Sequence, residues 1–278
     1  MLDGGLGAER RQHGRALDGI GLKMRPSKLA YTLYRALRKV VRAAHLMGPA
    51  RRLAGPTVGR LVFTLSPGGA RPAQLNGNRM YLAPSGSYPP LDMAMARYEP
   101  GTTRLFQETI KPGMVVVDIG AHVGYYTLLA AKQVGPTGKV FAFEPEQDNH
   151  ALLLKNIRMN GCNNVVAARM ALSDRAGTST LYLTGLDSGR HSMYHHGLPE
   201  RGSAPVETTT LDSFLASEQW PRVDLVKIDV EGAEVAVLDG MTRLMGNSAG
   251  LKLIIEFNPA LLQDGGVAPL GFLERLAS

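Results

Sequence analysis

The sequence predicts an α/β fold built on a doubly wound, mainly parallel sheet. In the second half of the 278-residue chain, short apolar runs alternate with stretches of helical periodicity. The first of these runs, VVVDI at 115–119, leads through a glycine-bounded turn into a helical pattern. Ligands of such sheets bind beyond the carboxyl ends of the strands. The sequence therefore places a site for a nucleotide-type cofactor at this turn.

Composition restricts the class of protein. A hydrophobic content of 44% over this length is enough to bury a substantial core. The sequence has no run of about eighteen apolar residues, and residues 1–20 lack the apolar centre of a secretory signal, so neither a membrane span nor export is indicated. Cys162 is the only cysteine and cannot form an internal disulfide. The expected location is the cytoplasm, with or without contact at the inner membrane surface.

The N-terminal third carries the positive charge of the chain. Residues 1–25 are rich in glycine and arginine and have no apolar periodicity, so they are expected to form a disordered leader, with Met24 as an alternative start of translation. Between Asp18 and Asp92 there are twelve lysines and arginines and no acidic residue. The net charge of +7 therefore comes from this segment, and the rest of the chain is net negative.

A basic amphipathic helix is predicted over 27–47, because Ser27 is a suitable N-cap, apolar residues recur at three- and four-residue steps, and Gly48 and Pro49 end the pattern. Two interpretations stay open. Segment 27–52 could contact an anionic membrane surface, where each Lys or Arg contributes about 1 kcal/mol. The helix could instead pack on the rest of the chain with its basic face in water. Nucleic acid is not favoured, because no aromatic platform accompanies the charges.

The remaining elements follow in order. Region 26–97 continues with a strand at 61–65, a hairpin within 73–82 around Asn76 and Gly77, and a linker or lid at 84–90. A domain over 98–278 begins with a helix at 102–110 and contains an inserted, β-prone substrate segment at 177–210. Strands are predicted at 114–119, 139–143, 164–168, 223–229 and 251–257. Helices are predicted at 123–134, 146–160, 210–218 and 232–246.

The turn after the first strand indicates which cofactor to expect. Gly120 and Gly124 allow the backbone to approach a ligand, and Glu144, at the end of the second strand, is well placed to bind ribose hydroxyls. A dinucleotide is disfavoured, because His122 would crowd a pyrophosphate and the carboxylate of Asp118 would repel it. A cofactor with a ribose, no phosphate and positive charge tolerates both residues. S-adenosylmethionine fits that description.

Polar residues at the end of the fourth strand are the second candidate group. Lys227, Asp229 and Glu231 fall on alternate positions and project to one side of the strand. One interpretation is a structural ion pair of Lys227, with Glu256 at the end of the fifth strand as the partner. In the other, these residues are catalytic, and Asp229 or Glu231 orients or deprotonates a hydroxyl. An acid cluster of this kind could also bind a divalent cation, although no metal is predicted.

Other titratable residues give weaker signals. His191, His195 and His196 lie in the inserted segment, and their spacing favours a mobile polar loop over a metal site. His122 is expected to shape the turn rather than to act as a base. Cys162 has no His or acidic partner nearby in the sequence, so a nucleophilic role is not expected.

Several segments, taken together and in order, resemble the FkbM-type methyltransferases, a Rossmann-like branch of the class I S-adenosylmethionine-dependent enzymes. The resemblance covers about 98–259. It implies O-methyl transfer to a hydroxyl of a sugar, glycolipid or polyketide. The segments that carry it are DIGAHVGYYT, VFAFEP, LLLKNIRMN, ALSD, TTLDSF, VKIDVEGAE and LIIEFNP.

The resemblance also implies roles for individual residues. It places the methionine part of the cofactor at Asp118, Gly120, Ala121 and Gly124. His122 is also expected among the cofactor-binding residues of this turn, although many relatives have Asn there. It places the ribose at Glu144 and the adenine near Ala171, Leu172 and Asp174. It directs Asp229, Glu231 and Glu256, with Lys227, toward the methyl group and the acceptor. The YEP segment at 98–100 is expected to close over the cofactor.

The end of the sequence departs from the family pattern. The chain stops at Ser278, within the helix after the fifth strand, whereas class I enzymes usually add two further strands, so we expect an unpaired sheet edge, in a fragment or beneath a partner. Two alternatives to a methyltransferase stay open. One is an NAD-dependent oxidoreductase, and the other is a non-catalytic membrane-surface module with a degenerate cofactor site.

Overall fold

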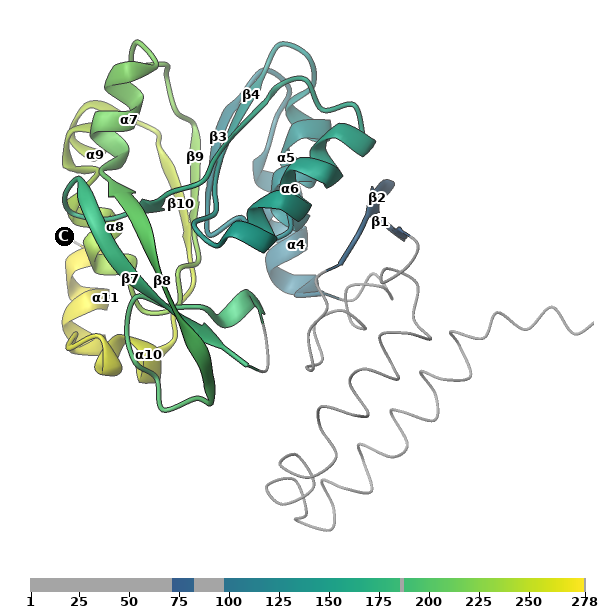
Figure 1. Cartoon of the computed structure of the whole chain (residues 1–278). Helices are drawn as coiled ribbons and strands as arrows, with labels where there is room; N and C mark the ends of the chain where they lie inside the picture. Colours follow the sequence, from purple (N-terminus) through teal and green to yellow (C-terminus); the bar gives the residue numbers. More distant parts are fainter. Residues whose placement is uncertain (1–71, 83–97, 186–187, 278) are drawn as a thin grey trace, which may run out of the picture.

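The computed structural model describes residues 72–82, 98–185 and 188–277 (Figure 1). The predicted leader, basic helix, strand at 61–65 and linker at 84–90 lie outside the described residues. Within the described residues, no helix has the length and the apolar character needed to cross a membrane.

The predicted hairpin is present. Strands β1 (Ala73–Leu75) and β2 (Asn78–Met80) pair antiparallel. Asn76 and Gly77 form the two-residue turn between them, both with positive φ (46° and 79°), as a tight hairpin turn requires. The side chain of Asn156 on α6 bonds both the N–H and the C=O of Tyr81, at 2.8 and 2.9 Å. The hairpin is thereby attached to the larger domain.

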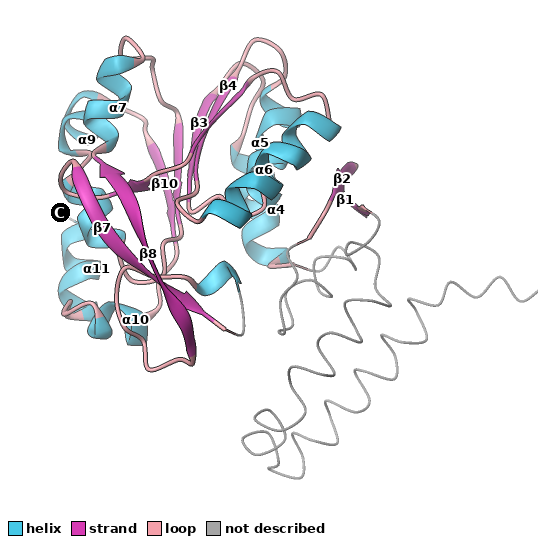
Figure 2. Cartoon of the chain, viewed as in Figure 1, coloured by secondary structure: helices cyan, strands magenta, loops and turns pink. Residues whose placement is uncertain are grey.

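Five parallel strands form the central sheet, in the order β10-β9-β3-β4-β5. Figure 2 shows β3, β4 and β10 of this sheet in magenta. This order, with helices on both faces, confirms the predicted doubly wound α/β fold. The predicted strands agree with the observed ones to within a few residues at each end. The strands are β3 (Val115–Ile119), β4 (Lys139–Phe143), β5 (Val165–Ala168), β9 (Leu225–Ile228) and β10 (Lys252–Ile255).

Two apolar cores cover the two faces of this sheet. On one face, α4 (Pro100–Thr109), α5 (Tyr125–Val134) and α6 (Gln147–Met159) pack with the hairpin. On the other face lie α7, α8, α9, α10 and α11. Their bounds are Leu211–Ser217, Glu234–Asp239, Thr242–Asn247, Pro259–Asp264 and Pro269–Ala277. Because strand side chains alternate between faces, Val116 enters the first core and Val117 the second.

The prediction of one helix over 232–246 is wrong, because the chain forms α8 and α9 with a break at Gly240. A Cβ on Gly240 would lie 2.0 Å from the carbonyl oxygen of Ser173, so the backbone passes directly against another segment there. The carboxylate of Asp212 then accepts hydrogen bonds from the N–H groups of Arg243 and Leu244, at 2.8 and 3.0 Å. A new helix begins where these N–H groups are capped.

The inserted segment forms its own small sheet, in which β7 (Gly177–Thr184) and β8 (Glu200–Thr209) pair antiparallel and β6 (Ala171–Leu172) joins β8. A short 3-10 helix, η1 (Ser188–Arg190), lies between β7 and β8. The β-prone pieces predicted within 177–210 are therefore strands. In the described part of the chain, β10 pairs only with β9.

Candidate functional site

The turn after β3 is built on a close approach of two strand ends. Gly120 (φ 78°) and Gly124 (φ 96°) have left-handed backbone conformations. A Cβ on Gly120 would lie 1.9 Å from the carbonyl oxygen of Asp229, directly after β9. Only glycine fits that position, because the obstacle is backbone. The N–H groups of Gly120 and Ala121 both donate to the carbonyl of Phe143, which joins the turn to the end of β4.

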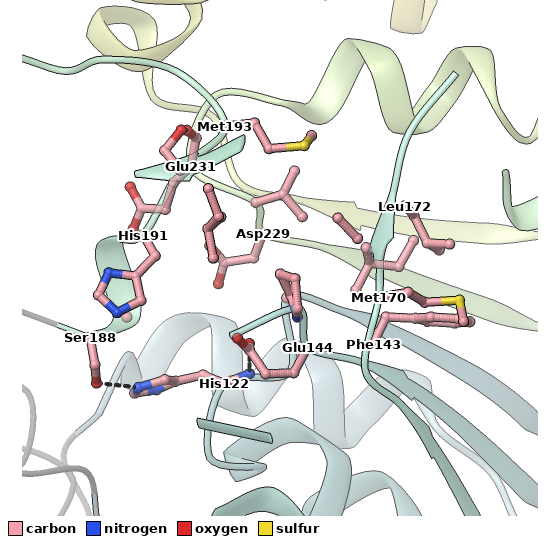
Figure 3. Close-up of a pocket in the computed structure, with 18 residues that line it drawn as sticks. His122, Phe143, Glu144, Met170, Leu172, Ser188, His191, Met193, Asp229 and Glu231 are labelled. Atoms are coloured by element: carbon pink, nitrogen blue, oxygen red, sulfur yellow. Dashed lines mark hydrogen bonds between the residues drawn. The ribbon is translucent and has the colours of Figure 1, made fainter. Parts of the chain in front are cut away.

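Two adjoining pockets open at this turn. The Glu144 pocket is drawn in Figure 3, and its walls include Phe143, Glu144, Met170, Leu172 and His191. The second pocket, called here the acid pocket, has the following residues in its wall: Tyr98, Glu99, Tyr126, Lys227, Asp229, Glu231 and Glu256. Gly120, His122, Gly189, Asp229 and Glu231 line both pockets. The two pockets are therefore parts of one continuous site.

Glu144 is a buried carboxyl group with a fixed orientation. Its side chain accepts hydrogen bonds from the backbone N–H groups of His122 (2.8 Å) and Glu146 (2.9 Å). Burial raises the pKa of Glu144 to about 7, even though both hydrogen bonds favour the charged form. The group can therefore gain or lose a proton near neutral pH when a ligand binds.

The predicted cofactor residues divide into two sets. The pocket walls include Gly120, Ala121, His122, Glu144, Ala171 and Leu172. Asp118, Gly124 and Asp174 line neither pocket. Gly124 is the N-cap of α5, and a Cβ there would meet Leu153 at 2.7 Å. Asp174 follows β6 at the surface and pairs with Arg175 at 3.0 Å.

Asp118 lies beneath the pocket floor. It is fully buried and shares a sheet face with Val116, so its side chain points toward α5, where the hydroxyl of Thr127 donates to it at 2.6 Å. Burial raises the pKa of Asp118, while Lys227, at 3.8 Å, acts in the opposite direction. Asp118 therefore contacts Thr127 and Lys227, and it is not part of either pocket wall.

Lys227 is the centre of a buried charge network. Its ammonium lies 2.9 Å from Asp229 and 3.8 Å from Asp118, and it is 4.8 Å from the ring centroid of Tyr126. The predicted ion pair is therefore present, but with Asp229 and Asp118 rather than with Glu256. Burial alone would lower the pKa of Lys227, and the two carboxylates raise it above its usual value. Burial alone would raise the pKa of Asp229, but the charge of Lys227 holds this pKa below its usual value.

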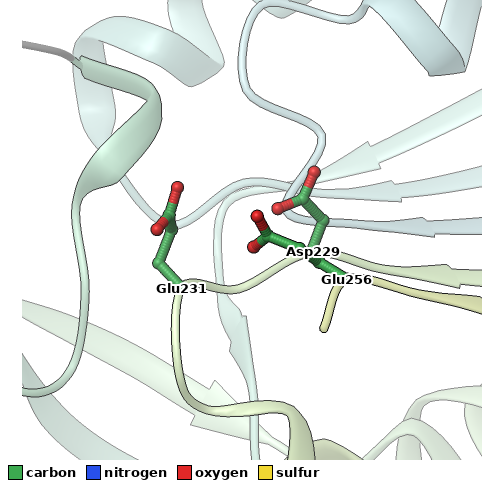
Figure 4. A group of neighbouring side chains, drawn as sticks. All are labelled: Asp229, Glu231 and Glu256. Carbon is green, nitrogen blue, oxygen red and sulfur yellow. The ribbon is translucent and has the colours of Figure 1, made fainter. Parts of the chain in front are cut away.

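The three predicted acidic residues meet at the strand ends (Figure 4). One carboxylate oxygen from each of Asp229, Glu231 and Glu256 lies within 4.8 Å of the others. Burial, and then the charge of Asp229, raises the pKa of Glu256 to about 9. At neutral pH a protonated Glu256 therefore stands beside an ionised Asp229. The same oxygens are potential ligands of a divalent cation, but Lys227 already neutralises Asp229, which favours a proton over a metal ion.

Other residues of the acid pocket were not indicated by the strand pattern. Glu99 has a left-handed backbone (φ 39°), and its carboxylate accepts a hydrogen bond from the hydroxyl of Tyr126 at 2.7 Å. The ring of Tyr98 packs against Tyr125 and Tyr126. Only the family resemblance of the YEP segment indicated Tyr98 and Glu99. Two consecutive tyrosines directly after the glycine turn were the available signal for Tyr126.

Each of the three histidines in the inserted segment has a hydrogen-bond partner. The interpretation of this segment as a mobile polar loop did not predict these partners. His191 lies in the wall of the Glu144 pocket and accepts a hydrogen bond from the N–H of Thr184 at 3.1 Å. His195 pairs with Glu200 at 2.7 Å. His196 pairs with Asp264 on α10 at 3.0 Å. In the described ranges, none of them belongs to a cluster suited to a metal ion.

Comparison with known proteins gives a consistent picture. A family model, the methyltransferase FkbM domain, matches residues 118–267. The hexuronic acid methyltransferase AglP of Haloferax volcanii is 29% identical over 150 residues, which cover 54% of this chain and 59% of that protein. The methyltransferase sdnD of Sordaria araneosa is 30% identical over 54% of this chain and 72% of its own length. The 2-O-methyltransferase NoeI of Sinorhizobium fredii is 25% identical over 60% and 73%.

Among solved structures, a SAM-dependent O-methyltransferase from Thermotoga maritima is 16% identical, with a TM-score of 0.39 over 63% of this chain and 49% of that one. The match to the first curated relative named above spans less than two thirds of that relative's length.

Proposed function

Since the chain belongs to the FkbM methyltransferase family, we propose that it binds S-adenosylmethionine and transfers the methyl group to a hydroxyl oxygen of a sugar, glycolipid or polyketide-type acceptor. The observation that carries this proposal is the continuity of the two pockets through Gly120 and Asp229. One pocket suits a nucleoside, and the other places carboxylates where a hydroxyl would react.

The Glu144 pocket fits adenosine. Each carboxylate oxygen of Glu144 accepts one backbone hydrogen bond and has a lone pair left for a ribose hydroxyl. Phe143, Met170 and Leu172 offer apolar surface for a flat base. Ala171 lies in the same wall. Gly120 lets the backbone approach the ligand, because it has no side chain in the pocket.

The acid pocket fits the charged end of the same cofactor. The ammonium and sulfonium groups of S-adenosylmethionine are positive, and Glu99, Asp229 and Glu231 supply negative charge in the acid pocket. The pyrophosphate of NAD would meet the same carboxylates and be repelled. An NAD-dependent oxidoreductase is therefore the weaker proposal. A non-catalytic module with a degenerate site is also the weaker proposal, because Gly120, Glu144 and Asp229 all lie in the pocket walls.

The residues of the chain supply positioning and a proton acceptor. When bound, the cofactor supplies an electrophilic methyl group. Asp229, kept ionised by Lys227, accepts the hydrogen bond of the acceptor hydroxyl and takes its proton as the new C–O bond forms. Glu256, protonated at neutral pH, can donate to an acceptor oxygen, and Glu231 can accept from a neighbouring hydroxyl. Most of the acceleration would come from holding the two reactants in line.

The chemistry of the acid pocket also favours a polyhydroxylated acceptor. Carboxylates and tyrosine hydroxyls bind vicinal hydroxyls through hydrogen bonds, and the acid pocket contains both kinds of group. One relative is named for hexuronic acid and another for 2-O-methylation. Both names agree with an oxygen of a sugar-like molecule as the acceptor.

Calorimetry tests the cofactor directly. The full-length chain is titrated with S-adenosylmethionine and, in parallel, with NAD. Saturable binding of S-adenosylmethionine is expected. A folded sample that binds NAD more tightly, or binds neither ligand, would overturn the proposal. A panel of sugars, glycolipids and polyketides, offered with methyl-labelled cofactor, then identifies the acceptor.

We further propose a cytoplasmic enzyme whose basic segment, 27–52, contacts an anionic membrane surface. The support is the absence of any acidic residue between Asp18 and Asp92. Sedimentation of the full-length chain with anionic and with neutral liposomes tests this contact. Equal sedimentation with both kinds of liposome would contradict it.

A further inference from the structure

Ser192, His196 and Asp264 form a hydrogen-bonded chain that ends at the backbone of Glu231, a residue in the walls of both pockets. One ring nitrogen of His196, Nδ1, lies 3.0 Å from the carboxylate of Asp264 at the end of α10. The other, Nε2, lies 2.7 Å from the hydroxyl of Ser192 and 2.8 Å from the backbone carbonyl of Glu231. The hydroxyl of Ser192 donates to the same carbonyl at 2.7 Å. Two side chains of the inserted segment thus converge on one backbone atom of a predicted catalytic residue.

His196 has an oxygen partner at each ring nitrogen. The carboxylate of Asp264 lies beside Nδ1, and the backbone carbonyl of Glu231 lies beside Nε2. Both partners can accept a hydrogen bond from the ring. Ser192 satisfies the same scheme, because its oxygen accepts from the N–H of Tyr194 at 3.1 Å and donates its own proton to Glu231. The chain is a charge-assisted link between α10 and Glu231.

Glu231 has a conformation that requires such support. Its φ of 52° lies in the left-handed region, which is unfavourable for a residue with a side chain. Gly232 follows with a φ of 102°, and a Cβ there would lie 2.8 Å from the carbonyl of Leu261 and 3.2 Å from His196. The backbone is therefore held between α10 and the inserted segment. The side chain of Glu231 extends from this turn into the acid cluster of Figure 4.

A serine, a histidine and a carboxylate in series are also the components of a hydrolase triad. Ser192 is only 2% exposed, and its hydroxyl proton is donated to a carbonyl rather than to His196. Its oxygen is therefore not available as a nucleophile. The arrangement is better suited to holding a backbone than to attacking a substrate.

We propose that His196 is a positioning residue: together with Ser192 and Asp264 it fixes the left-handed turn at Glu231 and so sets the direction of the Glu231 carboxylate in the site. The inserted segment then helps to hold Glu231, a residue of the acid pocket, in position. The effect on methyl transfer rests on the function proposed above, whereas the effect on the turn does not.

The test compares His196→Gln with His195→Gln in the full-length chain. Both histidines lie in the same segment and both pair with an acidic residue, but His195 is 65% exposed and bonds Glu200, away from Glu231. Hydrogen exchange of the 228–233 segment should become at least about tenfold faster in His196→Gln and stay unchanged in His195→Gln. Equal exchange in the two variants would overturn the proposal.

The rate of methyl transfer is the second measurement, because it would not change if His196 only stabilised the fold. The rate at saturating substrates should fall about tenfold in His196→Gln and stay unchanged in His195→Gln, because only His196 bonds the backbone of Glu231. If His196 acts through Glu231, adding His196→Gln to Glu231→Gln should cause no further loss of rate. Independent, multiplying losses would contradict this mechanism.

Two further controls separate the possible failures. Asp264→Asn keeps an acceptor for Nδ1 at a half-exposed position, so it should fold and show a smaller increase in exchange than His196→Gln. If the wild-type chain neither binds the cofactor nor transfers methyl, the proposed function fails. The exchange experiment would still decide whether the link holds the turn.

Discussion

The ammonium of Lys227 lies 2.9 Å from the carboxylate of Asp229, and both groups stand at the carboxyl end of β9 inside the site. In the sheet, Lys227 is also the register partner of Asp118 on β3. One cation therefore compensates two buried acids. Removing a single partner from a buried network leaves the remaining charges without compensation.

Lys227→Met is expected to reduce the free energy of unfolding by about 3–5 kcal/mol at neutral pH, the usual result of breaking a buried ion pair from one side. Urea unfolding monitored by circular dichroism measures it. Lys139→Met is the matched control, because Lys139 bonds Glu218 at a similar 2.8 Å, but with side chains 39% and 30% exposed. That pair should contribute no more than about 1 kcal/mol. Similar losses in the two variants would show that burial of Lys227 is not important.

Glu144 predicts a pH dependence of stability. Its pKa rises from the ordinary value of 4.5 to about 7 on folding, so the folded chain holds this proton while the unfolded chain releases it. The contribution of Glu144 to the free energy of unfolding is therefore fully present below about pH 4.5. It is lost as the pH rises to about 7, a change of about 3 kcal/mol. Unfolding free energies of wild type and Glu144→Gln across this range should diverge by that amount. Parallel pH curves would contradict the assignment.

Cofactor binding should release the same proton. A carboxylate that accepts ribose hydroxyls is favoured over the protonated acid, so affinity is expected to rise with pH up to about 7. Calorimetry in two buffers of different ionisation enthalpy counts the released protons. Glu144→Gln should release none and bind about 10- to 100-fold more weakly, which corresponds to the loss of hydrogen bonds to a charged group. Unchanged affinity in that variant would exclude Glu144 from ribose binding.

The sequence was sufficient for features that depend on neighbouring residues. Apolar runs that alternate with helical patterns located the five strands. The glycines at positions 120 and 124 located the turn between the first strand and its helix. A lysine within an apolar strand indicated an ion pair, but its partners are Asp229 and Asp118 and not the expected Glu256. Each of these signals comes from strand periodicity or from backbone sterics, and both act within a few residues.

Features that depend on distant contacts could not be read in this way. The break at Gly240 follows from the carbonyl of Ser173, which approaches from a different element. The link from His196 to Asp264 joins residues 68 positions apart. The family resemblance placed Asp118 at the cofactor, but no local pattern showed that the pairing of β3 with β9 would bring it beside Lys227. Tertiary packing, not local pattern, decides such cases.

His191 supplies a hydrogen-bond donor of known position. The N–H of Thr184 donates to its Nδ1 at 3.1 Å, so in the neutral ring the proton is on Nε2. Burial, and then the charge of Arg201, lowers the pKa of His191 to about 4, which keeps the ring neutral at physiological pH. Its Nε2 is buried and has no hydrogen-bond partner among the described residues, although His191 lines the Glu144 pocket. A bound ligand would satisfy this donor.

His191→Phe should therefore weaken cofactor binding about 5- to 10-fold, which corresponds to one hydrogen bond of about 1 kcal/mol. Calorimetric titration measures the change. His150→Phe is the control, because the Nε2 of His150 is also buried without a partner in the described structure, but His150 on α6 lines neither pocket. If both variants lose affinity equally, the effect of His191 is not through direct contact.

Gly120 allows the sharpest test of the strand-end geometry. In Gly120→Ala the new Cβ would lie 1.9 Å from the carbonyl oxygen of Asp229, and that oxygen cannot move unless the ends of β3 and β9 separate. Gly161 also has a left-handed φ, 64°, but nothing lies within 4 Å of a Cβ there. Gly161→Ala should therefore show backbone strain alone, about 1–2 kcal/mol.

Gly120→Ala should lose more than about 4 kcal/mol, because it adds a backbone collision to the same strain. It should also lose cofactor binding at temperatures where it stays folded, because Gly120 and Asp229 line both pockets. Thermal unfolding of the two alanine variants side by side gives the comparison. A Gly120→Ala chain as stable as Gly161→Ala would mean that β3 and β9 do not approach each other this closely at the site.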